Sequence, residues 1–359
     1  MMAMRALRVI ADLQVGGVQR MMLRTLRGLR DAGVESEVCC QRARGALADT
    51  FESEGFPVHL VSFRSRLDLR ALVRLRRLIS EKGFDVVHAH QYQSNIAVNT
   101  ACIGGVRARV INSYHSSLPV RNFTQALQLR LTRGVPSAFI AVSDAVREAL
   151  LHHGVPAAKT HVIHNGVPLP PAPAPFPKRG DGEPVELIYA GRFVSQKRLT
   201  LMLDVVKRCV ERGIPVHCTM LGEGPIVGRI RRLAGQGRLE GAITLPGVTH
   251  DVPSWLAKSD LYISTSEREG FANALLECCA AGRGFIASDI PPHREMLGDS
   301  GAGFLVGDSP DAWADILERL ARDRSELERL GAAAFRRVQD FSEQATCQKL
   351  LDLYSKVLE

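Results

Sequence analysis

The distribution of proline constrains the fold of this chain more than any other feature of the sequence. Seven of the 18 prolines of the 359 residues fall between positions 168 and 184. Proline has no backbone N–H and a fixed φ, so such a segment is typical of an extended, semi-rigid linker. The chain length also favours two domains. We therefore predict an N-terminal domain over 1–167, a linker over 168–184 and a C-terminal domain over 185–340.

Both halves of the chain alternate short β-rich runs with helical patterns. Strands are predicted at residues 6–11, 36–40, 58–61, 86–89, 110–113, 138–142, 186–190, 216–221, 243–245, 261–264 and 284–288. This alternation is typical of an α/β protein in which helices cover both faces of a parallel sheet. Ligands of such sheets bind beyond the carboxyl ends of the strands. The last segment, 341–358, carries Leu350, Leu351, Tyr354 and Leu358 on one stripe, which predicts an amphipathic helix.

The net positive charge of the chain comes from its first half. Residues 1–168 hold 22 Lys+Arg and 12 Asp+Glu, a net of +10, and the remainder holds 24 and 26, a net of −2, which together give +8. A basic half suits an anionic partner. The five Tyr and two Trp are not interleaved with the arginines, so a nucleic-acid partner is not expected. Residues 64–82 predict an Arg-rich amphipathic helix, whose basic face either is simply solvated or contacts anionic lipid.

Targeting and redox signals favour a cytoplasmic protein. No run of 18 apolar residues occurs, so no membrane-spanning helix is expected. The N-terminus runs into a strand and lacks the apolar region of a signal peptide. The eight cysteines form no Cys-x-x-Cys pair, which argues against a zinc or redox motif and fits a reduced compartment.

The stretch 261–281 combines a strand, a loop and an apolar helix. The loop holds Glu269 and Gly270, and Glu277 is the one charge in the helix that follows. A helix N-terminus after a strand suits phosphate, and Gly270 allows a close backbone approach. Carboxylates on both sides of such a phosphate site suit a nucleotide diphosphate-sugar, in which a ribose and a sugar flank the diphosphate. The alternative is that Glu269 caps the helix and Glu277 is a paired structural charge.

A second loop, 191–197, follows the strand at 186–190 and carries two cations. Arg192 can bind two phosphate oxygens at once, and Lys197 adds a point charge, so the loop suits a diphosphate. The alternative is a solvated loop. No Asp-x-Asp pair occurs in the sequence, so side-chain cations are expected to replace a metal ion.

Together these motifs resemble the retaining GT-B glycosyltransferases of family 4. Glu269-Gly270-Phe271 with Glu277 is similar to the family's Glu-x7-Glu motif, and Gly191-Arg192 with Lys197 resembles its diphosphate clamp. The resemblance covers nearly the whole chain and implies two Rossmann-like domains facing a cleft. It implies that the first domain, completed by a C-terminal helix over 341–359, binds the acceptor, and that the second binds the nucleotide-sugar.

The resemblance also implies site residues. Glu269 and His115, which follows the strand at 110–113, would act on the sugar as catalytic residues. Donor contacts are implied for Arg192, Lys197, Gly270, Phe271, Ala272, Asn273, Glu277, Gly16, Gly17 and Val248. No metal and no cofactor are implied. Ala272 stands where Gly or Pro is more usual, and Arg283-Gly284 stands where Gly-Leu-Pro is common.

The expected activity is transfer of a sugar, with retention, from a UDP-sugar to a saccharide or lipid-linked acceptor in cell-surface polysaccharide or glycolipid synthesis. Peripheral contact with the anionic inner face of the cytoplasmic membrane is expected as well. Two other classes stay open. One is a non-catalytic sugar-nucleotide-binding protein. The other is a nicotinamide oxidoreductase, because Gly222, Gly224 and Gly228 imitate Gly-x-Gly-x-x-Gly, although the last glycine is one residue late.

Overall fold

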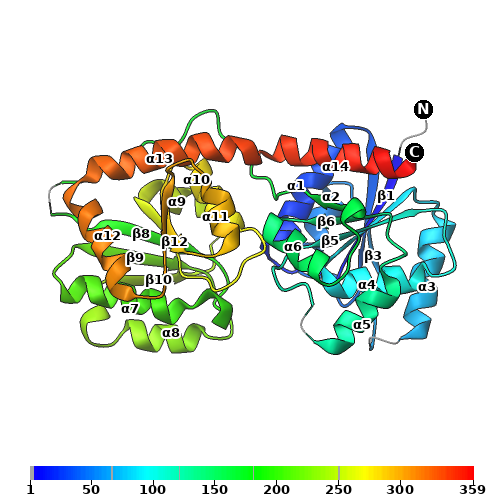
Figure 1. Cartoon of the computed structure of the whole chain (residues 1–359), viewed down its shortest axis with the longest axis horizontal. Helices are drawn as coiled ribbons and strands as arrows, with labels where there is room; N and C mark the ends of the chain where they lie inside the picture. The colour runs from blue at the N-terminus through cyan, green and yellow to red at the C-terminus, as the bar shows by residue number, and fades with distance from the viewer. Residues whose placement is uncertain (1–3, 66–67, 121, 181, 250) are drawn as a thin grey trace. The chain divides into compact units, whose positions relative to one another are not determined.

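The computed structural model describes residues 4–65, 68–120, 122–180, 182–249 and 251–359, which form two compact units (Figure 1). Unit 1 contains the chain up to Gly166 together with Glu343–Glu359, and unit 2 contains Val167–Ser342. The predicted linker thus belongs to unit 2, and its residue 181 lies outside the described residues.

Unit 1 is built on a seven-stranded parallel sheet in the order β3-β2-β1-β4-β5-β6-β7. Its strands are β1 (Met4–Ile10), β2 (Val34–Cys40), β3 (Val58–Leu60), β4 (Val86–His90), β5 (Arg109–Tyr114), β6 (Ala138–Ala141) and β7 (Thr160–Val162). Its helices are α1 (Gly17–Asp31), α2 (Ala48–Ser53), α3 (Leu69–Glu81), α4 (Gln91–Ala101), α5 (Phe123–Thr132), α6 (Asp144–His152) and α14 (Glu343–Leu358). Strand β7, three residues long at the sheet edge, is not among the strands predicted from the sequence.

Helix α3 is shorter than the sequence pattern predicts. It begins at Leu69 rather than at Arg64, because the Asp68 carboxylate caps it by accepting a hydrogen bond from the backbone N–H of Ala71 at 3.0 Å. Residues 66 and 67 of the predicted helix lie outside the described residues.

The C-terminal helix α14 packs on unit 1. Its buried face consists of Thr346, Cys347, Leu350, Leu353 and Tyr354, while Leu358, predicted to share the apolar stripe, is 38% exposed. Helix α1 approaches α14 closely at Gly28, where an added Cβ would lie 2.5 Å from the Cys347 Sγ. Leu350 and Tyr354 join the core formed by the strands of unit 1. A segment from the end of the chain therefore completes the N-terminal core.

Unit 2 is built on a six-stranded parallel sheet in the order β10-β9-β8-β11-β12-β13. Its strands are β8 (Val185–Ala190), β9 (Val216–Leu221), β10 (Ile243–Gly247), β11 (Leu261–Ser264), β12 (Gly284–Ser288) and β13 (Gly303–Val306). Its helices are α7 (Leu199–Glu211), α8 (Val227–Ala234), α9 (Val252–Lys258), α10 (Asn273–Ala280), α11 (Pro291–Leu297), α12 (Pro310–Arg322) and α13 (Arg324–Val338). The sequence analysis did not predict the edge strand β13.

Both sheets have the doubly wound topology that the sequence predicts. In each, the strand order reverses beside the first strand, between β1 and β4 in unit 1 and between β8 and β11 in unit 2. Ligands of open α/β sheets bind at this reversal, outside the carboxyl ends of the strands. The loops that follow these four strands are therefore where a site is expected.

Candidate functional site

In unit 2 the loops that follow β8 and β11 are joined into one structure. The Thr265 hydroxyl donates to the Lys197 carbonyl at 3.0 Å, and the backbone N–H of Glu267 donates to the Gln196 carbonyl at 2.9 Å. In return, the Gln196 side chain donates to the Arg268 carbonyl at 3.2 Å. These bonds fix the two loops together at the strand reversal.

Arg198 holds this junction in place, and the sequence analysis missed it. Its backbone has a φ of +45°, in the left-handed region that non-glycine residues rarely adopt. Its guanidinium donates to the Thr265 carbonyl at 2.9 Å, the Ser288 hydroxyl at 3.1 Å and the Asp308 carboxylate at 2.6 Å. Arg198 thus connects the carboxyl ends of β8, β11, β12 and β13. No sequence pattern distinguishes such a residue from the phosphate-binding cation predicted beside it.

Lys197, predicted as a donor contact, and Glu269, predicted as a catalytic residue, touch each other. The Lys197 ammonium forms an ion pair with the Glu269 Oε1, and the Ser266 hydroxyl donates to the same oxygen at 2.7 Å. Burial acts to raise the pKa of Glu269, but the Lys197 cation together with the hydrogen bonds from Lys197 and Ser266 holds the pKa below its ordinary value. Glu269 is therefore an ionised carboxylate in a largely buried position, able to accept hydrogen bonds.

His293 lies near this pair and was also missed. It is fully buried on α11, its Nδ1 contacts the Ser288 carbonyl at 2.8 Å, and its Nε2 has no hydrogen-bond partner within the described residues. Burial lowers the pKa of His293, while the Glu269 charge opposes that effect. The imidazole is therefore neutral at pH 7.

The remaining predicted donor residues of unit 2 lie on the same side of its sheet. Arg192 is exposed in the loop after β8, and Val248, 59% exposed, follows β10. Gly270, Phe271, Ala272 and Asn273 lead into the N-terminus of α10, and Glu277 is half-buried on that helix. The Phe271 ring is buried against Phe341, with ring centroids 5.2 Å apart, so only its backbone can face a ligand.

The glycines that imitate a dinucleotide-binding motif have a packing role. A Cβ on Gly222 would lie 1.9 Å from the Gly191 carbonyl oxygen, and one on Gly224 would lie 2.4 Å from the Phe193 carbonyl oxygen. Gly222 also has a φ of +132°. Both glycines are therefore explained by the close approach of the loops after β8 and β9. The oxidoreductase alternative loses its main support.

In unit 1 the predicted residues follow β1 and β5. Gly16 caps α1 and Gly17 begins it, so the free amides of a 15-residue helix lie at the glycine loop. His115 directly follows β5, and its Nε2 lies 3.2 Å from the Nδ1 of His90, at the end of β4. The His90 ring in turn stacks on His88, with centroids 4.3 Å apart.

Burial, reinforced by the Arg8 cation, keeps these histidines neutral. Arg8 is fully buried in β1 and donates to the Tyr354 hydroxyl at 2.5 Å and the Thr25 hydroxyl at 2.9 Å, and it also contacts His88. Burial and then the Arg8 cation lower the pKa of His115 to about 4 and hold that of His88 well below its ordinary value. The structure thus places a neutral His115 at the carboxyl edge of the sheet, with His88 a buried structural residue.

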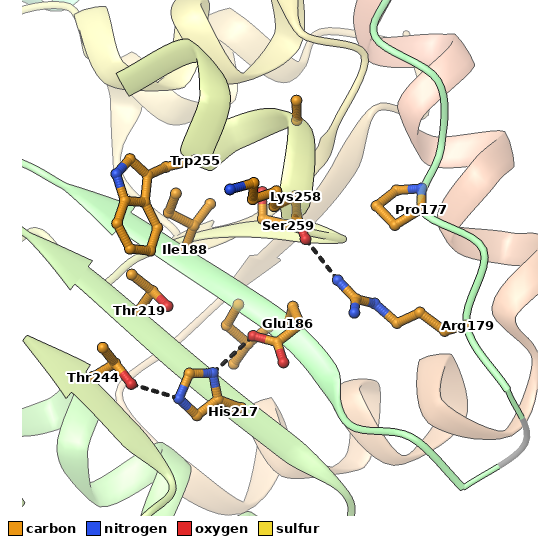
Figure 2. Close-up of a pocket in the computed structure, with 12 residues that line it drawn as sticks. Pro177, Arg179, Glu186, Ile188, His217, Thr219, Thr244, Trp255, Lys258 and Ser259 are labelled. Atoms are coloured by element: carbon orange, nitrogen blue, oxygen red, sulfur yellow. Dashed lines mark hydrogen bonds and ion pairs between the residues drawn. The ribbon is translucent and has the colours of Figure 1, made fainter. Parts of the chain in front are cut away.

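A cavity in unit 2 lies at the wrong end of the sheet for the donor. It has a volume of about 540 Å³ and lies beside the first halves of β8, β9 and β10 and the end of α9 (Figure 2). There the Glu186 carboxylate contacts the His217 Nδ1 at 2.7 Å, and the His217 Nε2 contacts the Thr244 hydroxyl at 2.8 Å. Gly191 and Thr265 follow the opposite ends of their strands, so this cavity is separate from the candidate site.

The described residues contain neither a cluster suited to a metal ion nor a helix suited to cross a membrane. Within 4–65, 68–120, 122–180, 182–249 and 251–359, no group of three or more His, Cys, Asp or Glu side chains is arranged to hold a metal ion. Over the same residues, no helix has the length and apolar character needed to cross a bilayer.

Comparison with known proteins identifies relatives along nearly the whole chain. Residues 15–169 match the model of Glycosyltransferase Family 4, and residues 174–337 match that of Glycosyl transferases group 1. The chain is 28% identical to the phosphatidyl-myo-inositol mannosyltransferase of Mycolicibacterium smegmatis, over 95% of this chain and 90% of that protein. It is 23% identical to the capsular polysaccharide biosynthesis glycosyltransferase CapH of Staphylococcus aureus, over 99% of each.

A solved structure shows the same fold. The crystal structure of Anabaena Alr3699/HepE in complex with UDP and glucose superposes with a TM-score of 0.84 at 19% identity, over 98% of this chain and all of that one. The predicted fold class, two Rossmann-like domains of the GT-B type, is confirmed by this likeness and by the two parallel sheets.

Proposed function

Because the chain belongs to the family 4 glycosyltransferases, we propose that it transfers a sugar from a UDP-sugar to a saccharide or lipid-linked acceptor, with retention and without a metal ion. The observation that carries this proposal is the joined pair of loops at the β8–β11 reversal, with the Lys197–Glu269 pair beside the α10 N-terminus. Names of relatives support the acceptor class, since they include a phosphatidyl-myo-inositol mannosyltransferase and a capsular polysaccharide glycosyltransferase. UDP and glucose in the Anabaena structure support the donor class.

The proposed chemistry follows from the charges of these residues. The exposed Arg192 and the backbone amides at the N-terminus of α10 stabilise the negative charge that builds on the departing diphosphate. Lys197 keeps Glu269 ionised, so its carboxylate accepts hydrogen bonds from sugar hydroxyls and faces the positive charge that develops on the sugar ring. A neutral His115 both donates and accepts hydrogen bonds to the sugar.

The two glutamates test the proposed donor orientation. If Glu277 holds the ribose hydroxyls, Glu277→Gln should weaken binding of UDP itself about tenfold to a hundredfold, because a hydrogen bond to a charged group contributes about 1.5–3 kcal/mol. Glu269→Gln should leave UDP affinity nearly unchanged and lower kcat, because only the sugar meets that carboxylate. Calorimetry with UDP and turnover of the UDP-sugar separate the two effects.

Glu240→Gln is a matched control that should change neither quantity, because Glu240 is exposed and directly follows the 3-10 turn Gly237–Leu239. The opposite pattern, with UDP affinity lost in Glu269→Gln and kept in Glu277→Gln, would reverse the donor orientation. If neither variant changed binding or turnover, both carboxylates would be structural and the proposed site would be wrong.

Metal independence is the second test. Arg192 and the α10 amides are proposed to neutralise the diphosphate, so transfer should continue at an unchanged rate in excess EDTA. Transfer is measured as UDP release from the purified enzyme, before and after the chelator. Complete loss in EDTA, restored by Mn²⁺ or Mg²⁺, would contradict this part of the proposal.

Membrane contact belongs to the same proposal, as a peripheral attachment of a cytoplasmic enzyme. On α3, Leu69 and Val73 are 72% and 58% exposed and lie among arginines. On α5, Phe123 and Leu131 are 82% and 73% exposed. Both helices pack against α4 in unit 1. Exposed apolar residues beside arginines are the combination that suits an anionic bilayer surface.

Vesicle sedimentation tests this attachment. Binding to anionic vesicles should fall as salt rises, because exposed charges are screened over roughly 10 Å at 0.1 M. Replacing Arg70, Arg74 and Arg77 by Gln should weaken it further, and Phe123→Ser should weaken it without changing its salt dependence. Equal, salt-insensitive binding to neutral vesicles would rule out the electrostatic attachment, and no binding to either would mean that the basic face is only solvated.

A further inference from the structure

Unit 1 contains a second cavity, at the carboxyl edge of its sheet. It has a volume of about 210 Å³ and lies between the ends of β1 and β2 and the helices α3, α4 and α5. Side chains that line it include Gln41, Arg42, Phe63, Tyr92, Gln93 and Gln128. All of them belong to unit 1, so the cavity is complete within that unit.

Gln41 has an amide that lacks a partner. The residue is 4% exposed and lines the cavity, and its Nε2 has no hydrogen-bond partner in the described part of the chain. Its backbone N–H donates to the Ile10 and Ala11 carbonyls, both at 3.1 Å, so the residue is fixed to the end of β1. A buried donor without a partner is destabilising, and native proteins keep few of them. The unpaired Gln41 Nε2 is accounted for if a bound ligand supplies its hydrogen-bond acceptor.

The backbone next to the cavity is strained. Gln91, the first residue of α4, has a φ of +69°, and among the described residues the only other non-glycine with a positive φ is Arg198 at the donor loops. Such strain is concentrated at functional sites. The next residue is Tyr92, whose hydroxyl lies 2.8 Å from the Gln128 Oε1 and 3.1 Å from the Gln125 carbonyl. The strained residue therefore directly precedes Tyr92, a lining residue of the cavity that is held in place by hydrogen bonds to α5.

The lining selects a class of ligand. Amides and a phenol offer donors and acceptors, Phe63 and Tyr92 offer ring faces, and no carboxylate occurs among the described lining residues. Among the described lining residues the single cation is Arg42, which is already paired with the Asp12 carboxylate at 3.2 Å. The volume is below the roughly 300–1,000 Å³ of pockets for drug-sized ligands, so it suits a single ring.

We infer that this cavity binds one uncharged polyhydroxylated ring of the acceptor, a pyranose or a cyclitol, with the Gln41 Nε2 donating to a ring hydroxyl. The inference rests on the proposed glycosyl transfer and names the part of the acceptor that unit 1 recognises. Gln41 and Tyr92 are then residues that determine acceptor specificity.

The test is binding of free rings to the whole chain, with UDP present at saturation. The probes are D-glucose, D-galactose, D-mannose, N-acetylglucosamine and myo-inositol, observed by saturation-transfer NMR and titrated. At least one should bind the native protein, and Gln41→Met should weaken its binding about threefold to tenfold, the effect of losing one neutral hydrogen bond. Tyr92→Phe should weaken it as well, whereas Gln348→Met, an exposed substitution on α14, should not.

The stability of Gln41→Met provides an independent readout. Because the amide is unpaired in the free protein, replacing it by an apolar side chain of similar size should leave the thermal midpoint unchanged or raise it. A lower midpoint would show that the amide is already paired and would overturn the inference. So would binding of no ring, equal binding to the variant, or binding of inositol 1-phosphate in place of every neutral ring. Absence of UDP binding would instead contradict the proposed function, since UDP is assigned to unit 2.

Discussion

Replacing Arg283 by Met should lower the free energy of unfolding of unit 2 by about 4 kcal/mol or more. The residue is fully buried before β12 and donates to the carbonyls of Ala257 and Ser259, each at 2.8 Å. It also donates to the carbonyls of Ala174 and Pro175, at 3.0 and 2.8 Å. Met removes all of these donors at once. A buried carbonyl left without a partner costs about 1–3 kcal/mol, and here the Ser259 bond is buried and the other three are partly buried.

Tryptophan fluorescence during urea unfolding measures this loss, because the two tryptophans of the chain, Trp255 and Trp313, both lie in unit 2. Arg322→Met is the matched control. Arg322 is 77% exposed and pairs only with Glu318 one turn away, so its loss should cost less than about 1 kcal/mol. Arg283→Lys should recover little, since an ammonium cannot reproduce the fork of the guanidinium. A loss below 1 kcal/mol in Arg283→Met would contradict the proposed role.

Arg283 explains a departure from the family pattern that the sequence alone left without a reason. Its guanidinium lies over the Phe176 ring, 5.1 Å from the centroid, and bonds to two carbonyls of the proline-rich segment. Nearby, a Cβ on Gly282 would lie 2.4 Å from the Pro173 Cβ. The segment is extended, as its prolines predict, but it is docked on unit 2. Proline content predicts a backbone conformation and carries no information on what the backbone packs against.

Sequence patterns predicted the interior of each sheet better than its edges. The bounds of β9, β11 and β12 agree with the prediction residue for residue, because interior parallel strands are buried on both faces and read as continuous apolar runs. The edge strands β7 and β13 are only three and four residues long, and most of their residues are partly exposed, so neither stands out from the loops around it. The reversal of strand order could not be read from the sequence, since it depends on which strands pair.

The same distinction applies to the sites. The site residues that the sequence predicted directly follow strands and belong to a sequence motif, as Glu269 does. Those that were missed, such as Arg198, His293 and Gln41, have a role only through neighbours distant in sequence. The pairing of Lys197 with Glu269, 72 residues apart, is the clearest case, because each residue had been assigned a ligand of its own. Spacing along a chain identifies groups on one element and does not identify partners across two loops.

That pairing leads to the second large expected effect. Lys197→Met should abolish transfer and lower the free energy of unfolding by about 3 kcal/mol, because it leaves the Glu269 carboxylate buried without a counter-charge. The double variant Lys197→Met/Glu269→Gln should recover most of the lost stability and none of the activity. Urea unfolding of the single and double variants forms a double-mutant cycle that isolates the pair. Additive losses would show that the two charges are not coupled.

The pH dependence of the single variant distinguishes an unpaired charge from a packing defect. Without Lys197, burial becomes the dominant influence and should raise the pKa of Glu269 above its ordinary value. A carboxyl whose pKa is higher in the folded protein than in the unfolded chain binds its proton preferentially in the folded state, so stability rises as pH falls. The deficit of Lys197→Met should therefore shrink between pH 8 and pH 5, whereas a packing defect would stay constant. With Glu269→Gln added, the dependence should vanish, because no carboxyl is left at the site to take up the proton.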